Sequence, residues 1–453
     1  MTTAPADPAA TGLRALAALA APVVLSRLGV MMMGLTDTII VGHFSPTELA
    51  YLALAWAPTM VVLTTAIGLL TSVQVLAAQR VGEGHEAETG AVLRVGLQLA
   101  FYVGAVAAAA LFFFGPWLLH SFGLKKNLAE GAALPVQILA LSLLPYLLSV
   151  AISFWLEAMG QARTSMWFMW AANIVNLLLN LWLVPGHNIL GASGAYGTAL
   201  ATLGARIFLL ACLALFVLRW EMARTRYGLF QRARQGLLQA MLRIGLAAAG
   251  SLCVETTAFA GMNIVAGWLG AFEAAGWSIV LNVAAIIFML PLGLSSATAV
   301  LVGQAYGAGD GAAIRARGLL GMVVTTLLLA LICLVMIFTA PWVAAAYTQD
   351  AALLKLVIPA LMLSCLFFIT DGLQVVAAYA LRARGDVWWP TILHVINYAV
   401  IMLPLGWFLA HPMGGGVNGI VWAVVIASFL AATVLVGRFL WLSRDKAALA
   451  LAA

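Results

Sequence analysis

The segment Met31–Val41, MMMGLTDTIIV, carries a single carboxylate, Asp37, late in an apolar run that begins near Leu13. A charge at membrane depth costs about 3 kcal/mol or more of insertion free energy. Charges that persist at such depth usually face a bundle interior or a water-filled cavity, where they serve a function. The segment therefore indicates a membrane protein, and it marks one place to look for that function.

The composition is that of an integral membrane protein. Of its 453 residues, 64% are hydrophobic and 8% are charged, whereas a soluble domain carries about 25% charged residues. The apolar runs are long and continuous, which favours helices over a β-barrel. The net charge of +6 comes mostly from residues between the runs, so it indicates topology and not nucleic acid binding. The four cysteines lie singly in apolar runs and no nucleotide-binding loop is present, so we expect no cofactor.

Twelve runs are long enough to cross a membrane as helices, which need about 20 residues each. We expect spans near 13–41, 52–78, 92–118, 134–156, 166–184, 195–218, 238–269, 275–302, 319–342, 353–381, 387–409 and 417–442. An even number of spans places both termini on one side of the membrane. Basic residues on that side outnumber those on the other by seventeen to three. This bias predicts cytoplasmic termini.

The two halves of the chain are related by a repeat. Matching positions in the two halves are always separated by the same number of residues, which is the separation of Pro116 from Pro341, and we call this separation the repeat offset. The positions that match at this repeat offset include one dipeptide, one glutamine and several glycines: Pro116-Trp117 with Pro341-Trp342, Gln79 with Gln304, Gly68 with Gly293, Gly82 with Gly307, and Gly84 with Gly309. Six spans per half give both halves the same orientation. Parallel repeats are typical of transporters in which two bundles rock around a site between them. A duplicated bundle without a transport role is the alternative.

The repeat predicts an all-α membrane protein with two six-helix bundles around a central cleft. We expect the bundles at 13–219 and 237–443, joined by a basic cytoplasmic linker at 220–236. Residues 1–12 and 444–453 are expected to be short tails.

Three acidic residues lie deep in predicted spans: Asp37, Glu255 and Asp371. None of their repeat mates is acidic, so duplication alone did not place them. Glu255 and Asp371 come from different spans and could converge on a cation. Removal from water favours the protonated form of a carboxyl group, so such an acid can load H⁺, whereas added amide or hydroxyl oxygens would suit Na⁺. Neutralisation by a buried arginine or a helix end is the structural alternative.

Polar residues recur near these acids. Asn173, Asn176 and Asn180 lie on one face of the fifth span, where they can face Asp37 or join helices by hydrogen bonds. Ser278 and Asn282 form another polar step, in the eighth span.

Three further residues interrupt the apolar spans. Pro22 lacks an N–H group and breaks a backbone bond of the first span, which predicts either a hinge or a fixed kink. Arg27 lies ten residues before Asp37, about 15 Å along the helix, so it cannot pair with that acid. Arg206, in the sixth span, could reach the interior of the first bundle or pack against carbonyl groups.

These residues together resemble the multidrug and toxic compound extrusion (MATE) transporters, most closely their NorM-like branch. The resemblance covers nearly the whole chain and rests on the stretches Met33-Gly-Leu-Thr-Asp37-Thr, Val254-Glu255 and Thr370-Asp371-Gly372, and on the Gln-x-x-Gly-x-Gly turns at Gln79 and Gln304. It implies a secondary-active antiporter that exports cationic, often aromatic drugs in exchange for H⁺ or Na⁺.

The resemblance also implies roles for individual residues. Glu255 and Asp371 would form the cation site of the C-terminal bundle, and Pro22 would bend the first helix. A polar site in the N-terminal bundle would consist of Asp37, Asn176, Asn180 and Thr198. One position departs from the pattern, because NorM-like proteins often have a tyrosine where this chain has Phe367. The missing hydroxyl favours H⁺ slightly, and both ions remain open.

The main alternative function is a flippase for lipid-linked precursors. A flippase predicts a basic central cavity, whereas Arg27 and Arg206 are the only bases at span depth. An intramembrane enzyme or a passive channel is a third possibility, and we expect neither. We expect a monomer in the bacterial plasma membrane, with organic cations and lipid as its partners and no nucleic acid.

Overall fold

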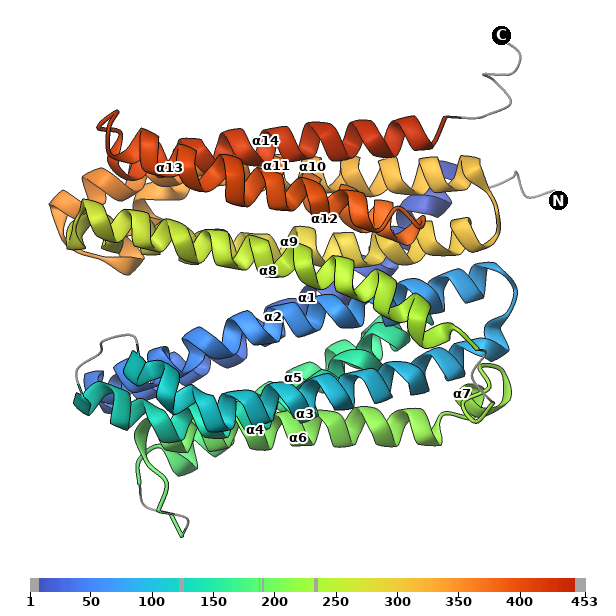
Figure 1. The fold of residues 1–453 in the computed structure, drawn as a ribbon, viewed down its shortest axis with the longest axis horizontal. Helices are drawn as coiled ribbons and strands as arrows, with labels where there is room; N and C mark the ends of the chain where they lie inside the picture. The colour runs from blue at the N-terminus through green and yellow to red at the C-terminus, as the bar shows by residue number, and fades with distance from the viewer. Residues whose placement is uncertain (1–7, 122–125, 187, 190, 232–234, 445–453) are drawn as a thin grey trace. The chain divides into compact units, whose positions relative to one another are not determined.

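The structure is a computed structural model that describes residues 8–121, 126–186, 188–189, 191–231 and 235–444, and within these ranges every regular element is a helix (Figure 1). Twelve helical segments are long and apolar enough to cross a membrane. The predicted all-α class and the predicted number of spans are therefore confirmed. Of the predicted tails, residues 1–7 and 445–453 lie outside the described residues, whereas residues 8–12 already form the start of the first helix.

The helices of the first sequence half begin with one unusually long pair and end with a short helix of the predicted linker. They are α1 (Pro8–Phe44), α2 (Pro46–Gly82), η1 (Glu86–Glu88), α3 (Thr89–Ser121), α4 (Lys126–Ala158), α5 (Ala162–Leu183), α6 (Gly194–Arg219) and α7 (Glu221–Thr225). Those of the second half are α8 (Leu237–Leu269), α9 (Ala271–Gly307), α10 (Gly311–Tyr347), α11 (Ala351–Ala383), α12 (Trp388–His394), η2 (Val395–Met402), α13 (Leu403–Ala410) and α14 (Gly416–Leu442). The elements α12, η2 and α13 form one continuous span, in which η2 is a π-helix.

The repeat is visible in the helix bounds themselves. Both ends of α2 are separated from the corresponding ends of α9 by the repeat offset, and the same holds for α4 and α11. The last residues of α1 and α8, Phe44 and Leu269, are also separated by this offset. The offset found in the sequence therefore relates whole structural elements.

The Gln-x-x-Gly-x-Gly turns end α2 and α9 in the same way. Gly84 has a φ of 77° and Gly309 a φ of 70°, a left-handed conformation that glycine adopts without a steric penalty. The residue after each glycine donates its N–H to a carbonyl of the last helical turn, at 3.0 Å in both copies. This pattern is a glycine C-cap that satisfies carbonyl groups left free at a helix end.

The chain folds into two compact units that differ from its two sequence halves. Unit 2 contains Leu25–Ala249, and unit 1 contains Met1–Val24 together with Gly250–Ala453. The first part of α1 therefore belongs to the unit of the second repeat, and the first part of α8 belongs to the unit of the first repeat. The two division points, after Val24 and after Ala249, are themselves separated by the repeat offset.

A glycine supports each of these exchanged helix segments. In unit 2, a Cβ built on Gly68 of α2 would lie 2.8 Å from the Cα of Ala249. In unit 1, a Cβ built on Gly293 of α9 would lie 2.8 Å from the Cα of Val24. No real Cβ fits at such distances, so only glycine allows the backbones to approach this closely. The two contacts are repeat mates.

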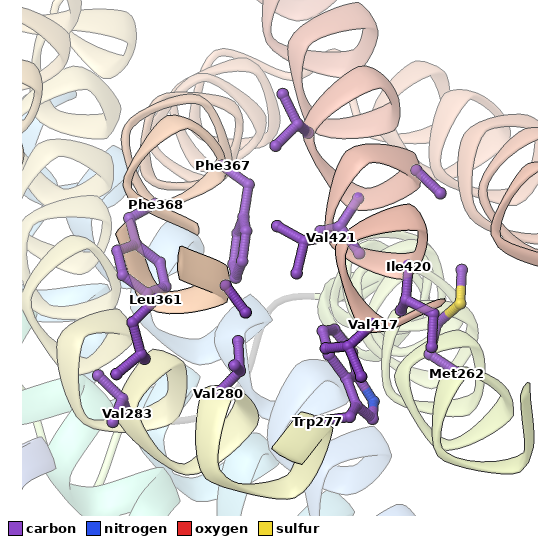
Figure 2. Close-up of a cluster of buried hydrophobic side chains, with 14 of the residues drawn as sticks. Met262, Trp277, Val280, Val283, Leu361, Phe367, Phe368, Val417, Ile420 and Val421 are labelled. Atoms are coloured by element: carbon purple, nitrogen blue, oxygen red, sulfur yellow. The ribbon is translucent and has the colours of Figure 1, made fainter. Parts of the chain in front are cut away.

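The core of unit 1 includes a buried cluster formed by α8, α9, α11 and α14 (Figure 2). Met262 comes from α8, Trp277 and Val280 from α9, and Val417 from α14. Trp277 is fully buried beside Val417. Phe367 and Phe368 of α11 also lie in this cluster, with ring centroids 4.6 Å apart. The cluster is mostly apolar and also contains Tyr398, whose hydroxyl bears on the missing tyrosine discussed below.

Candidate ion-binding and substrate-binding sites

Unit 2 holds a carboxylate centre around Asp37, whose side chain is fully buried. Asn176 and Asn180 donate their amides to Oδ1 of Asp37, at 3.1 Å and 2.8 Å. Thr202 donates its hydroxyl to Oδ2 at 2.7 Å. Thr198 donates its hydroxyl to Oδ1 of Asn180 at 2.7 Å and thereby orients that amide. Three donors thus satisfy the carboxylate, as is usual for a buried polar group.

Helical spacing explains how these side chains meet. Asn176 and Asn180 are four residues apart on α5, and Thr198 and Thr202 are four residues apart on α6. Residues four apart lie on one face of a helix, so each helix contributes two polar groups to the centre around Asp37 on α1. Three of these four groups bond to Asp37 itself. Thr202 was not predicted, although its spacing from Thr198 is a signal that the sequence carries.

Asn173 is the member of the predicted asparagine stripe that lies outside this centre. Its amide donates to the carbonyl of Met169 at 2.9 Å, within its own helix. Its Oδ1 atom is buried and has no hydrogen-bond partner among the described residues. The structure therefore does not bring Asn173 to Asp37.

Two arginines accompany the acids of unit 2: Arg206 is buried, and the Arg27 side chain is 14% exposed. Arg206 donates to Oγ of Ser142 at 2.8 Å, and its guanidinium lies 4.4 Å from the ring centroid of Tyr146. It is also within electrostatic range of Asp37. Arg27 forms an ion pair of 3.4 Å with Glu157 at the end of α4.

Glu157 is a buried acid that the sequence prediction missed. Its side chain is 3% exposed, and besides Arg27 it accepts a hydrogen bond of 2.7 Å from Gln74 of α2. It lies one residue beyond the predicted fourth span, where a charged residue is expected to be at the membrane surface. Four buried acids are thus present among the described residues, where three were expected.

Unit 1 holds a second centre with two carboxylates, Glu255 on α8 and Asp371 on α11, which are 8% and 6% exposed. Gln374, one turn after Asp371, donates its amide to Oδ1 of Asp371 at 2.7 Å. The hydroxyls of Tyr398 and Ser428 donate to the same oxygen at 3.5 Å. Glu255 is within electrostatic range of Asp371 and close to the Tyr398 hydroxyl. The two predicted acids therefore lie in one buried group.

The hydroxyl expected at position 367 is supplied from another helix. Phe367 packs in the cluster of Figure 2, against the ring of Phe368. Tyr398 instead reaches Asp371 from the π-helix η2, and its hydroxyl also accepts a hydrogen bond from Gln374. A π-turn changes which residues share a face, so the 3.6-residue pattern gave no indication that Tyr398 faces the acids.

The donor set of unit 1 fits a hard monovalent cation as well as a proton. The Oε1 atom of Gln374 is buried and has no hydrogen-bond partner among the described residues. Together with the two carboxylates and the Tyr398 hydroxyl it offers the oxygen ligands that hard cations prefer. In the described part of the chain, no group of three or more His, Cys, Asp or Glu side chains could hold a metal ion.

The remaining predicted residues lie apart from both centres. Ser278 and Asn282 of α9 are exposed, and the Ser278 hydroxyl donates to the carbonyl of Ala274 in its own helix at 2.8 Å. Pro22 is buried inside α1, two residues before the division between the units. Helix α1 continues without a break through this proline.

The fold and the two centres define a class: a multi-span membrane protein built from a duplicated helix bundle, with a buried carboxylate centre in each compact unit. The sequence profile of the MatE family matches residues 22–182 and 247–408. The first residues of the two matches are separated by the repeat offset, in agreement with the duplication.

Individual proteins give the same picture. The chain is 50% identical over 450 residues to a probable multidrug resistance protein NorM of Caulobacter vibrioides, covering 98% of this chain and 95% of that protein. It is 31% identical over 433 residues to a multidrug resistance protein NorM of Burkholderia vietnamiensis, covering 93% and 92%. The crystal structure of the eukaryotic MATE transporter AtDTX14 superposes with a TM-score of 0.88 at 18% identity, covering 96% and 97% of the two chains. A MATE structure in the bent conformation gives 0.85 at 21% identity, covering 97% of each chain.

The chain belongs to the MATE family of transporters. The family assignment predicted from the acids of three spans is therefore confirmed, and with it the expectation that the protein is not an enzyme.

Proposed function

We propose that the protein is a secondary-active antiporter that exports organic cations, drugs among them, in exchange for H⁺ or Na⁺ by alternating access. The observation that carries the proposal is the buried group of Glu255, Asp371 and Gln374, in which two carboxylates and an unpaired oxygen can accept a cation. Two relatives are named as multidrug resistance proteins, which supports drugs as the substrates that are transported.

We assign the coupling ion to unit 1 because its carboxylates are less well satisfied than Asp37. Asp37 accepts three hydrogen bonds of 3.1 Å or less, whereas Asp371 accepts one such bond and two of 3.5 Å. Each donor stabilises an ionised carboxylate. A proton or Na⁺ therefore gains more by binding at unit 1 than at Asp37. The Asp37 centre is left to hold the charged group of the drug.

In this mechanism the side chains bind and release the ion and the drug, and no covalent bond is formed or broken. A cation bound between Glu255 and Asp371 neutralises charge in the C-terminal bundle, and a drug cation bound at Asp37 does so in the N-terminal bundle. Moving one charge across 100 mV is worth about 2.3 kcal/mol, which is enough to drive export against a drug gradient. Tryptophan and phenylalanine rings of the bundles offer cation–π contacts to such a drug.

The contacts of the buried bases disfavour the flippase alternative. Arg27 is paired with Glu157, and Arg206 lies against Ser142 and Tyr146. Each of these two guanidinium groups therefore already has a partner within unit 2, although its Nε atom makes no hydrogen bond among the described residues.

The excess of basic residues on one side supports cytoplasmic termini, and the bacterial relatives support a place in the bacterial plasma membrane. A monomer suffices for the proposed cycle, because both centres belong to one chain.

Ethidium accumulation in inside-out proteoliposomes tests the proposal. Imposed pH and Na⁺ gradients are applied separately, so that the gradient that drives uptake names the coupling ion. We expect Asp371→Asn to abolish gradient-driven uptake, while Glu83→Gln, which changes an acid at the end of α2, transports as the unchanged protein does. Uptake at the normal rate by Asp371→Asn would contradict the role of unit 1, and accumulation under no gradient would contradict antiport.

A further inference from the structure

Apart from Asp37 and Asp371, the first and fourth helices of each repeat carry one buried acid and one largely buried base, with the polarity reversed between the units. In unit 2 the base is Arg27 on α1 and the acid is Glu157 on α4. In unit 1 the acid is Glu255 on α8 and the base is Arg382 on α11. Glu157 and Arg382 are repeat mates. The duplicated position has therefore kept a buried charge while its sign changed.

The two pairs also differ in whether they are closed. Arg27 and Glu157 lie 3.4 Å apart, and Gln74 donates a further hydrogen bond of 2.7 Å to the acid. Arg382, in contrast, has Nε and Nη2 atoms that are buried and lack a hydrogen-bond partner among the described residues. Glu255 is within its electrostatic range, yet Glu255 remains available to another cation.

The surroundings of Arg382 contain few compensating groups. Its side chain is buried, and its guanidinium lies 5.8 Å from the ring centroid of Tyr379 on the same helix. From neighbouring elements it meets the charge of Glu255 on α8 and the ring of His394 on α12. His394 is itself held by Ser251 at 2.6 Å. An arginine stays charged even when buried, so Arg382 adds a permanent positive charge to this bundle.

We propose that Arg382 is a fixed internal cation that limits the carboxylate centre of unit 1 to a single coupling ion. Glu255 and Asp371 carry two negative charges and Arg382 carries one positive charge. One monovalent cation then neutralises the bundle, whereas a second would leave an excess of positive charge in an apolar environment, which is costly. The inference rests on the proposed antiport and extends it to the number of ions exchanged.

The closed pair of unit 2 supports this assignment. Arg27 and Glu157 cancel one another in direct contact, so that position needs no ion from outside. In unit 1 no such contact joins Glu255 and Arg382, so the corresponding position can accept one coupling ion. Arg382 is a positioning residue in this view, because it acts through Glu255 and does not touch the ion.

The ratio of ions to drug tests the proposal. Proteoliposomes are clamped at zero potential, and the steady-state ethidium gradient is measured against the imposed gradient of the coupling ion. The logarithmic slope gives the ratio, which we expect to be about one for the unchanged protein and about two for Arg382→Gln, because the uncompensated charge doubles. Arg382→Lys keeps the charge and should give about one. Arg384→Gln is the matched control and should also give about one, because Arg384 is the C-cap residue of α11 and is bound to the end of α14.

A direct count of bound ions tests the proposal even for a variant that folds but transports too poorly for the slope to be measured. Bound Na⁺, or protons taken up, are counted per molecule of purified protein, and Arg382→Gln should bind one more than the unchanged protein. A slope of about one for Arg382→Gln, or an unchanged ion count, would overturn the role of Arg382 while leaving antiport intact. A slope of two in the unchanged protein would also overturn it. Failure of both gradients to drive the unchanged protein would instead refute the antiport itself.

Discussion

The two carboxylate centres lie in the two copies of one duplicated fold, yet their buried charges are stabilised in opposite ways. In unit 2 the acids are satisfied from within: Asp37 accepts three hydrogen bonds and Glu157 is paired with Arg27. In unit 1 Asp371 accepts one short hydrogen bond, from Gln374, and two nitrogen atoms of Arg382 lack a partner among the described residues. A buried polar group without partners raises the free energy of the folded protein. Binding of an ion in unit 1 can therefore lower that free energy. In the proposed mechanism this difference separates the centre that binds the drug from the centre that binds the coupling ion.

The largest expected effect comes from neutralising one acid in each centre. Glu255→Gln should lose gradient-driven ethidium uptake completely, because unit 1 would then carry no net negative charge. Asp37→Asn should keep the gradient dependence but raise the KM for ethidium about tenfold, equal to about 1.4 kcal/mol of binding free energy. Uptake assays over a range of ethidium concentrations measure both. If Asp37→Asn lost coupling while Glu255→Gln retained it, the two roles would have to be exchanged.

The next effect concerns the closed and open pairs. Arg27→Met leaves Glu157 as a buried charge without its base, and breaking such a pair costs about 3 kcal/mol of stability. Arg382→Met removes a charge that forms no ion pair among the described residues, so it should cost less stability than Arg27→Met. Thermal unfolding of the two purified variants in the same detergent gives the comparison. Equal losses would show that Arg382 is held by contacts as strong as those of Arg27.

The smallest effect concerns the hydroxyl at the unit 1 centre. Tyr398→Phe removes a polar ligand beside Asp371 and should weaken affinity for the coupling ion about threefold to tenfold, the usual net value of one hydrogen bond. Phe367→Tyr should not restore it, because position 367 faces the mostly apolar cluster of Figure 2. The double variant therefore behaves as Tyr398→Phe alone when the ion dependence of uptake is measured. Recovery in the double variant would contradict the packing of Phe367.

Local patterns in the sequence predicted most of the architecture. Apolar length predicted the twelve spans, and a constant offset predicted the repeat that the helix bounds now display. The acids were found because a charge is conspicuous in an apolar run. Asn176 and Asn180 were found because their helical spacing needs no knowledge of a partner helix.

The residues that were missed depend on contacts between helices or on position near a helix end. Gln374 and Ser428 are uncharged polar residues, and both contact Asp371. Whether they face this acid depends on how α11 and α14 are rotated about their axes, which the local sequence does not show. Tyr398 sits in a π-helix, where the usual periodicity fails. Glu157 and Arg382 directly follow apolar runs, where surface charges are expected, but both are buried. No local pattern distinguishes a charge at the membrane surface from one folded inward.

The exchange of helix segments between the units has a consequence for biosynthesis. A chain that emerges from the ribosome in order cannot complete unit 2 until Ala249 has been made, which is well into the second repeat. The segment of α1 up to Val24 waits longer, because its glycine partner, Gly293, lies in α9. Neither repeat made as a separate polypeptide would contain all of its own packing surface. Two separately expressed halves should therefore accumulate only when produced together, each completing the other.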